Sequence, residues 1–446
     1  RDYYASRGLG DVYKRQLVVD GKAQEVETLT LEDCLRIGID NNLSLEGKRK
    51  EIQKSKYGVS ENRSKLLPQI TVIAGYNNNF DPPVSVTDGS SYGVPYNITK
   101  TLQHTANAGL EMQMPLFNQT LYTSMSIAKV MEEISRLSYG KAREDIIMQI
   151  SKMYYLGQVT AEQIVLIKAN ITRLEELRDI TQAFFDNGMS MEVDLKRVNI
   201  NLENLKVQYD NAQAMMKQQL NMLKYIMDYP AEKEFVLTPV NTDSITTVAL
   251  TGLSENIYEL QLSQSQVQLA EKQKKIISNG YIPSLSLTGS WRYAAYTDKG
   301  YHWFHSGPSN HWFRSYGLGL TLRIPIFDGL DKTYKIKKAM IDIENSKLAW
   351  ENARKSLQTQ YLNAVNDLMN NQRNFKKQKD NYLLAEDVYT VTSDRYREGI
   401  ASMTEVLQDE MQMSEAQNNY ISAHYNYRIT NLMLLKLTGQ IESLVK

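Results

Sequence analysis

The chain has 446 residues, and its 51 Lys and Arg balance 51 Asp and Glu, so its formal net charge at pH 7 is zero. A neutral chain without a basic run argues against a nucleic-acid partner. The single cysteine, Cys34, excludes an internal disulfide. No stretch of about 18 consecutive apolar residues is present, which excludes a transmembrane helix.

The N-terminal stretch does not look like part of the native protein. The chain starts at Arg1 instead of Met, and residues 1–16 resemble a translated vector or adapter sequence more than a native leader. We therefore expect 1–16 to be a non-native leader, and we take 17–229 as the first of two repeats.

The first repeat opens with one helix and two strands. Thr30 to Asp33 matches a capping box, which predicts a helix running to about Lys65. Apolar and polar residues then alternate over 69–80 and again over 103–114, which is the period of strands with one apolar and one polar side. A loop rich in Pro, Gly and Ser separates the two strands.

The first repeat continues into a long helical hairpin over 118–228, a stretch without proline. Asn118 is suited to cap the first helix. The stretch breaks once, at 187–190, where Gly188 can take the left-handed conformation that ends a helix and Ser190 can cap the next one. At 1.5 Å per residue, the outgoing helix is on the order of 100 Å long.

The same order of elements recurs after a connector over 230–253, so we expect a duplicated architecture. The second repeat takes up 254–446, and Gly399 and Ser402 mark the break in its hairpin. Its expected elements are a helix from Ser254 to about Asn279, strands over 284–297 and 312–324, and a helical hairpin over 328–437 with its turn at 398–402.

The apolar side of the amphipathic strands can be explained in two ways, by a soluble domain or by a membrane barrel. Alternation usually means a half-buried sheet in a soluble domain. Here, however, the expected helices are far longer than the strands, and three of the four Trp lie between Trp291 and Trp312, near strand ends. Aromatic residues that flank a band of alternating residues are typical of a membrane barrel.

A barrel in a membrane must close on itself, because lipid offers no hydrogen-bond partners to an open edge. Four strands are too few to close, so several copies of the chain must share one barrel. Two copies would supply eight strands with a filled interior, and three would supply about twelve strands with room for a lumen.

A stripe along the second hairpin predicts how its helices pack. Large apolar and aromatic residues recur there at every seventh position, which is the spacing of a coiled-coil seam. We interpret this stripe as a helix-packing core rather than a ligand site. Its members are Leu368, Phe375, Tyr382, Tyr389 and Tyr396.

Four short motifs, together with the duplicated plan, resemble the TolC family of outer-membrane efflux proteins. They are Pro-Leu-Phe-Asn at 115–118, Pro-Ile-Phe-Asp at 325–328, the segment 396–407 and the segment 425–432. The resemblance spans about 28–439, nearly the whole chain. It assigns four prolines to swivels between the barrel and the helices, namely Pro68, Pro115, Pro283 and Pro325.

The resemblance implies a mainly α fold with a membrane β part. Three chains would form an α-barrel of long coiled-coil hairpins, joined to a shared β-barrel of about twelve strands, four from each chain. It also implies the exit duct of a tripartite efflux or type I secretion system. The partners would be a periplasmic adaptor, an inner-membrane pump and the lipid of the bacterial outer membrane.

The resemblance places a periplasmic gate at the tips of the hairpins. Asp194 matches an acidic position that bonds across the hairpins to a tyrosine, here Tyr396, and Glu405 matches an acidic residue of the narrowest ring. Three carboxylates around one opening would favour cations. Two positions depart from the family pattern, because Ala401 and Gln408 stand where some members carry a gate arginine and a second acidic ring.

The resemblance also assigns the tips to adaptor docking, and simpler explanations compete with the gate roles. Glu405 also completes a capping box, Asp194 is also a first-turn acid favoured by the helix dipole, and Tyr396 continues the seven-residue seam. The expected tip turn and docking residues are Gly188, Ser190, Gly399 and Ser402.

Enzymatic activity is not expected. His302, His305 and His311 cluster in one proposed loop, but no paired-histidine helix motif, phosphate loop or nucleophile elbow accompanies them. We therefore expect neither a cofactor nor a metal. The alternative to a conduit is a soluble trimeric coiled-coil scaffold without a membrane role, which detergent dependence during purification would distinguish.

Overall fold

The computed structural model describes residues 27–100, 102–239, 252–297 and 312–445. The expected leader, and the loop that carries His302, His305 and His311, lie outside the described residues. The chain divides into two compact units. The first comprises Arg1–Glu46, Lys141–Ile257 and Ser356–Lys446, and the second comprises Gly47–Gly140 and Tyr258–Lys355.

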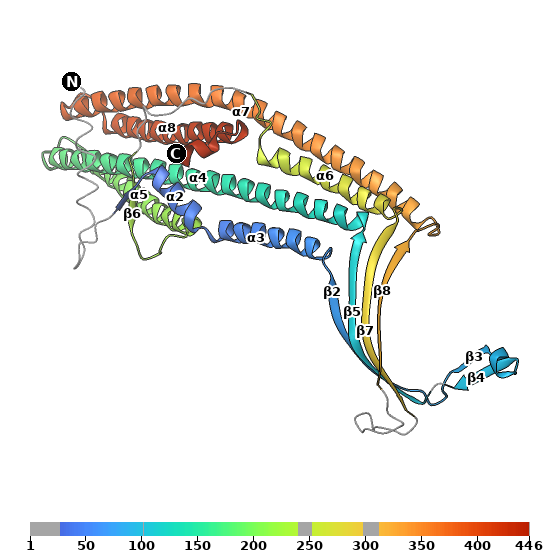
Figure 1. Ribbon diagram of the computed structural model, residues 1–446. Helices are drawn as coiled ribbons and strands as arrows, with labels where there is room; N and C mark the ends of the chain where they lie inside the picture. Colours follow the sequence, from blue (N-terminus) through green and yellow to red (C-terminus); the bar gives the residue numbers. More distant parts are fainter. Residues whose placement is uncertain (1–26, 101, 240–251, 298–311, 446) are drawn as a thin grey trace. The chain divides into compact units, whose positions relative to one another are not determined.

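Four long helices dominate the chain, and they form two hairpins of nearly equal dimensions (Figure 1). The outgoing helices α4 and α7 have 68 and 67 residues, and the returning helices α5 and α8 have 36 and 35. This correspondence supports a duplicated plan. The bounds are Gln119–Asp186 for α4, Glu192–Met227 for α5, Asp331–Arg397 for α7 and Met403–Leu437 for α8.

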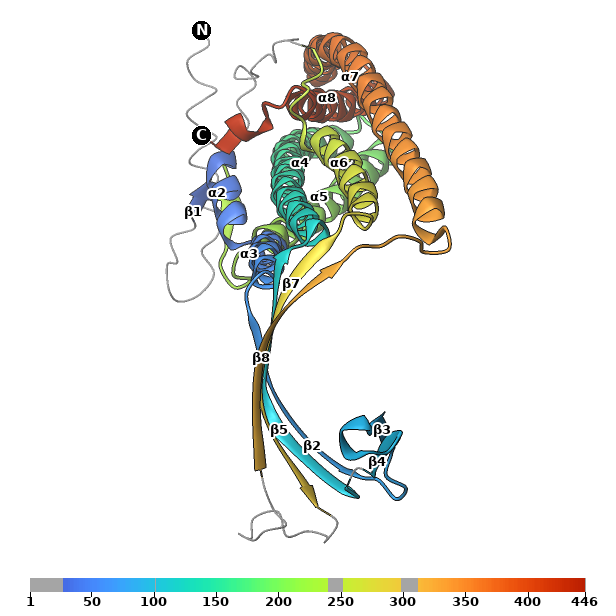
Figure 2. The same cartoon turned by 45° about the vertical axis from the view of Figure 1, so that its right-hand side comes forward.

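The second unit holds an antiparallel sheet of four strands in the order β2-β5-β7-β8 (Figure 2). Strand β5 runs through Pro115, beyond the end expected from the sequence. Here β5 has already passed the end of β2, so the missing N–H of proline costs no ladder bond on that side. The bounds are Gln69–Asn78 for β2, His104–Phe117 for β5, Ser284–Thr297 for β7 and Trp312–Arg323 for β8.

The loop after β2 contains a hairpin that the sequence did not indicate. Strand β3, Val84–Asp88, pairs with β4, Tyr96–Lys100, and the 3-10 turn Ser90–Tyr92 (η1) lies between them. Each strand has only five residues, and Pro, Gly and Ser surround them, so the alternation is too short to stand out from a loop.

The single opening helix expected to reach Lys65 is in fact two helices. Helix α2 covers Leu31–Asn41 and α3 covers Leu43–Ser64. The break lies at Asn42, whose side-chain oxygen accepts from the Leu45 N–H at 3.1 Å while its amide donates to the Ile226 carbonyl at 2.8 Å. This tertiary bond holds the side chain in the capping position, so the chain turns there.

The connector carries a short strand, β6, Phe235–Leu237, which pairs in parallel with β1, Glu27–Leu29. Around this pair lies the largest apolar core of the first unit. Helix α2, the helices of the first hairpin and the 3-10 turn Ile441–Val445 (η2) all contribute to it. Its largest fully buried members include Leu35, Ile147, Leu223 and Met227.

The seven-residue seam is confirmed as a helix-packing core. Tyr389 and Tyr396 are buried with α4, α5 and α8 residues, and Phe375 and Tyr382 pack against Tyr420. The rings of Phe375 and Tyr420 are stacked with centroids 5.8 Å apart. No helix in the described residues combines the length and apolar character needed to cross a membrane.

Candidate functional site

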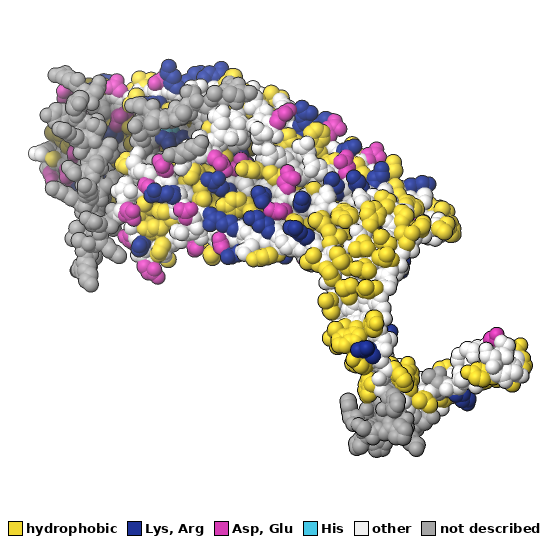
Figure 3. All heavy atoms as spheres, viewed as in Figure 1, with side chains coloured by type: hydrophobic (Ala, Val, Ile, Leu, Met, Phe, Trp, Pro, Cys, Tyr) yellow, Lys and Arg dark blue, Asp and Glu magenta, His cyan; other side chains and the backbone are white. Residues whose placement is uncertain are grey.

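The four-stranded sheet has one apolar face that no described residue of its unit covers. Cross-strand register aligns Val72 with Leu110, Leu110 with Trp291, and Trp291 with Tyr316, so these four side chains share that face. The exposed fractions of Val72, Leu318 and Leu320 are 72%, 80% and 66%. Figure 3 shows the resulting hydrophobic band over the strands.

The opposite face of the same sheet is polar. Thr71, Glu111 and Ser290 lie on it, and Arg292 forms an ion pair with Glu111. Glycine is required on this face where the strands approach closely, because a Cβ on Gly109 would overlap the carbonyl oxygen of Trp291. The sheet therefore has one apolar and one polar face.

The junction prolines lie between helix and strand, or at a strand end, in the second unit. Pro68 directly precedes β2 and Pro283 directly precedes β7, and each follows a tight turn with an i to i−3 backbone hydrogen bond. Pro115 belongs to β5, next to a register shift between Pro115 and Phe117. Pro325 follows β8 in an irregular segment that leads to α7.

The two hairpin turns have the same backbone geometry. Gly188 and Gly399 have φ values of 73° and 75°. The Gly188 N–H donates to the Phe185 carbonyl, three residues back, at 2.9 Å. The Met189 N–H donates to the Phe184 carbonyl, five residues back, at 2.8 Å. Gly399 and Ile400 repeat this pattern at 2.9 and 2.8 Å. Both are Schellman motifs.

Replacing Gly399 by Ala tests the need for this conformation. An added Cβ would meet no atom within 4 Å, so the cost is the left-handed backbone, about 1 kcal/mol. We expect a lower melting temperature for Gly399→Ala. The matched control is Gly47→Ala, which also has open space but lies inside α3, where alanine is favoured over glycine and should not destabilise. Equal losses in both variants would contradict this.

The caps of the two returning helices differ, and one prediction is wrong. Ser402 caps α8 in a full capping box, because the Glu405 N–H donates to the Ser402 hydroxyl and the Ser402 N–H donates to the Glu405 carboxylate at 2.9 Å. Ser190 does not cap α5, because the N-cap is Met191, which has no side-chain cap bond. Both turns have five residues between their helices, and in each the N-cap is the third residue after the glycine, a position held by Met191 in the first hairpin and by Ser402 in the second.

Tyr396 and Asp194 have separate partners in the described chain. The Tyr396 hydroxyl donates to the Thr181 hydroxyl at 3.3 Å, and the ring is buried beside Phe184. Asp194 pairs with Arg197 at 3.3 Å. The Asp194 to Tyr396 bond that the family resemblance implies is not among the hydrogen bonds of the described residues.

Arginines tie the two hairpins together near their turns, a role that the sequence did not reveal. Arg197 on α5 donates to Thr404 on α8 at 3.3 Å, and Arg397 on α7 pairs with Glu176 on α4 at 3.4 Å. No sequence signal could have found these pairs, because each joins residues more than 200 positions apart. Glu405 and Gln408 lie exposed on α8, one helical turn apart.

A buried polar cluster lies between α4 and α8. The Tyr420 hydroxyl donates to Glu162 at 3.1 Å, and Arg428 donates through Nε to Nε2 of His424 at 3.0 Å. His424 is fully buried, and its Nδ1 lies 3.4 Å from the Glu162 carboxylate. Because Nε2 accepts a hydrogen bond, the ring carries its proton on Nδ1, facing Glu162. Glu162 and Arg428 are partly exposed at the edge of this cluster, which binds the helices together.

Two further carboxylates are buried in the same unit. Burial raises the pKa of Glu144 to about 7, although the nearby Lys436 opposes this shift. Burial raises the pKa of Glu410 to about 6. Among the described residues, no group of three or more His, Cys, Asp or Glu side chains is placed to hold a metal ion.

Comparison with known proteins identifies the family. The model of the family described as outer membrane efflux protein matches residues 37–227 and 243–440. The outer membrane protein TolC of Vibrio cholerae is 21% identical over 396 residues, covering 86% of this chain and 84% of that protein. The probable efflux pump outer membrane protein TtgC of Pseudomonas putida is 23% identical over 382 residues, covering 80% of this chain and 75% of that protein.

The fold agrees with solved structures. The crystal structure of CusC has a TM-score of 0.76 with 14% identity, and the match covers 95% of each chain. The Campylobacter jejuni CmeC outer membrane channel has a TM-score of 0.75 with 17% identity, covering 92% of this chain and 85% of that one. Because the family model matches most of the sequence, this chain belongs to the outer membrane efflux protein family.

Proposed function

We propose that this chain forms the outer-membrane exit duct of a tripartite efflux or type I secretion system. It conducts substrates passively from an inner-membrane pump across the periplasm and the outer membrane, together with a periplasmic adaptor. The observation that carries the proposal is the four-stranded sheet, which has an uncovered apolar face and a polar face. The apolar face suits lipid, and the polar face suits a water-filled lumen.

The sheet edges support assembly from several copies. In the described chain, β2 and β8 each pair with one neighbour only, so both leave an open row of backbone groups. Each unpaired group in hydrocarbon costs several kcal/mol, so β8 of one copy should pair with β2 of the next. Three copies supply about twelve strands, enough to enclose a lumen.

Exposed apolar residues on α7 support lateral contact between copies. Ile341, Leu348, Leu362, Met369 and Leu383 all fall on one seven-residue register, and each is at least half exposed in the single chain. A stripe of this spacing is typical of a helix seam whose partner helix is not in the same chain. A neighbouring copy in a homotrimer supplies such a helix.

The hairpin tips are the proposed gate and the proposed adaptor contact. Glu405 and Gln408 are exposed on α8, so three copies would bring three carboxylates and three amides around one axis. The Glu405 carboxylate accepts the Ser402 N–H through one oxygen, which leaves the other free for ions. Opening requires the ties through Arg197 and Arg397 to rearrange. Adaptor docking falls on the turns at 187–190 and 398–402.

Glu405→Gln tests the gate separately from the cap. Glutamine preserves the capping box but removes the charge. We expect the open channel to lose cation selectivity in single-channel recordings, because the ring loses three negative charges. The control is Glu415→Gln, which removes the same charge from an exposed position of the same helix. Unchanged selectivity of Glu405→Gln, with a normal trimer, would contradict the ring.

The duct itself is tested by purification and imaging. The protein should need detergent, run as a heat-sensitive oligomer, and show threefold particles with a hollow cylinder attached to a short barrel. A trimer that purifies from the aqueous fraction would instead indicate a soluble coiled-coil scaffold. A compact monomer would contradict both.

A further inference from the structure

We infer that the ends of α3, α6 (Tyr258–Asn279) and α7 next to the sheet form a binding surface for anionic phospholipid headgroups. The inference rests on the proposed function, which puts the sheet in the outer membrane and the helices on its periplasmic side. The partner would therefore be the acidic lipid of the periplasmic leaflet, such as phosphatidylglycerol.

The first turns of α7 carry an unusual density of positive charge. Lys332, Lys335, Lys337 and Lys338 all lie within the first eight residues of the helix, Asp331 to Lys338. The positive end of the helix dipole disfavours cations at a helix start. Helix stability therefore does not explain this cluster, whereas an external anion would be attracted to it.

Carboxylates offset only part of this charge. Lys332 pairs with Asp328 at 2.9 Å, and Lys335 pairs with Asp331 at 2.6 Å. The next two lysines, Lys337 and Lys338, have no carboxylate partner among the described residues, and both are exposed. The Lys337 ammonium lies over the exposed Tyr334 ring, 5.6 Å from its centroid, and both lysines can still contact an anionic ligand from solvent.

Two other helices end beside the same sheet with the same charge. Helix α6 carries Lys272, Lys274 and Lys275 within its last eight residues, before the turn into β7. Helix α3 carries Arg63 in its last turn, and Lys65, which pairs with Glu61 at 3.4 Å, follows the helix four residues before β2 begins. Although the whole chain is neutral, each of these three helix ends has more basic than acidic residues.

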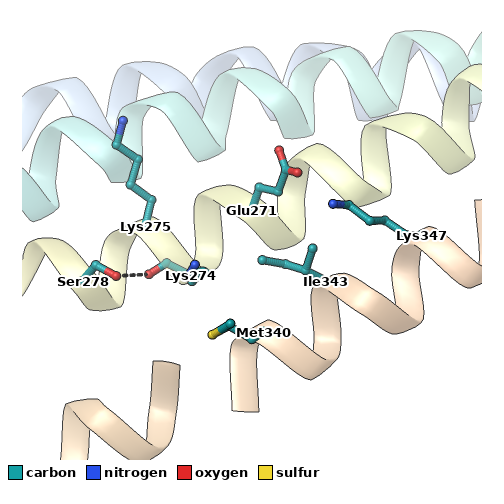
Figure 4. A pocket seen from close by; sticks show the side chains of 7 residues that line it. All are labelled: Glu271, Lys274, Lys275, Ser278, Met340, Ile343 and Lys347. Carbon is teal, nitrogen blue, oxygen red and sulfur yellow. Dashed lines mark hydrogen bonds between the residues drawn. The ribbon is translucent and has the colours of Figure 1, made fainter. Parts of the chain in front are cut away.

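A groove between α6 and α7 combines this charge with apolar surface (Figure 4). Its volume is about 480 Å³. Ammonium groups suit a phosphodiester, and apolar side chains suit the adjoining glycerol and first acyl carbons of a lipid. The lining includes Glu271, Lys274, Lys275, Met340, Ile343 and Lys347.

The position of the charge favours a membrane over other anions. Lys and Arg side chains lie over the helices that border the hydrophobic band of the sheet (Figure 3). Basic residues directly beside a membrane-embedded segment are attracted to acidic headgroups, and the attraction fades within a Debye length. Lys275 near the end of α6, and Lys337 and Lys338 near the start of α7, lie next to the sheet, where a membrane-embedded sheet would place acidic headgroups.

The test uses the full chain in nanodiscs of phosphatidylcholine mixed with phosphatidylglycerol, and measures the lipids retained by native mass spectrometry. We expect wild type to retain phosphatidylglycerol over phosphatidylcholine by about fivefold or more at low salt. The variant Lys275→Glu/Lys337→Glu/Lys338→Glu should lose most of this preference. The matched control is Lys376→Glu/Lys377→Glu/Lys379→Glu, which changes the same charge in the second half of α7 and should keep it.

The outcomes separate this inference from the duct proposal. A protein that enters nanodiscs but shows no lipid preference overturns the headgroup surface and leaves the duct intact. Equal loss of preference in both triple variants overturns it as well, because net charge alone would then explain the effect. A protein that never enters nanodiscs contradicts the duct proposal itself.

Discussion

Leu320→Arg should prevent membrane insertion of the assembled protein. Leu320 is 66% exposed on the apolar face of β8, and its cross-strand partner is Leu287. An arginine that faces lipid costs up to about 2–4 kcal/mol per chain, depending on its depth, and every copy in the proposed barrel would carry it. We expect the heat-sensitive oligomer to disappear from the outer-membrane fraction, as measured by unheated gel electrophoresis.

The control for this substitution is the next residue in the chain. Thr321 is also exposed, but it lies on the polar face, opposite Ser286. Thr321→Arg adds the same side chain toward the proposed lumen, so the oligomer should persist. If both variants insert, the apolar face does not contact lipid. If neither inserts, the strand itself does not tolerate arginine, and the face assignment fails.

Glu410→Gln should stabilise the protein in mildly alkaline solution. Glu410 is 5% exposed on α8, and its Oε1 has no hydrogen-bond partner among the described residues. Burial raises its pKa from 4.5 to about 6, so ionisation is harder in the folded state than in the unfolded state. The shift corresponds to about 2 kcal/mol of stability that is lost above the folded pKa.

The direction of the pKa shift determines at which pH the substitution stabilises the protein. The stabilising contribution of the protonated carboxyl is fully present below pH 4.5 and disappears as the pH rises through about 6. Glu410→Gln should therefore raise the melting temperature by a few degrees at pH 8 and leave it nearly unchanged at pH 4. Glu415→Gln, at an exposed position of α8, is the control. A gain that is independent of pH would contradict burial as the cause.

The helical hairpins and the strands were accessible to sequence reasoning because their signals are local. Long helices are indicated by a stretch without proline, their turns by a glycine before a helix start, and strands by the alternation of apolar and polar residues. Each of these signals can be recognised from residues close together in the sequence. Strand β7 accordingly has the bounds expected from the sequence, and helix α7 begins three residues after the expected start of its hairpin. The capping box at Ser402 and Glu405 could be predicted for the same reason, since it needs only four consecutive residues.

Elements that depend on a distant partner were missed or misread. The break at Asn42 needs the carbonyl of Ile226, and β1 is a strand only because β6 lies beside it. Ser190 has the residue type of a cap, but the turn geometry gives that position to Met191. The arginine ties at Arg197 and Arg397 likewise join two hairpins that local pattern cannot align.

Composition and periodicity therefore established two long helical hairpins and four amphipathic strands, because the period of apolar residues is set within each element. Tertiary structure alone decided that the strands join in one sheet with a continuous uncovered apolar face, and that Tyr396 is directed to Thr181. The physical reason is that strand register and side-chain partners depend on contacts between residues far apart in the chain. A local sequence pattern does not predict the free energies of these contacts.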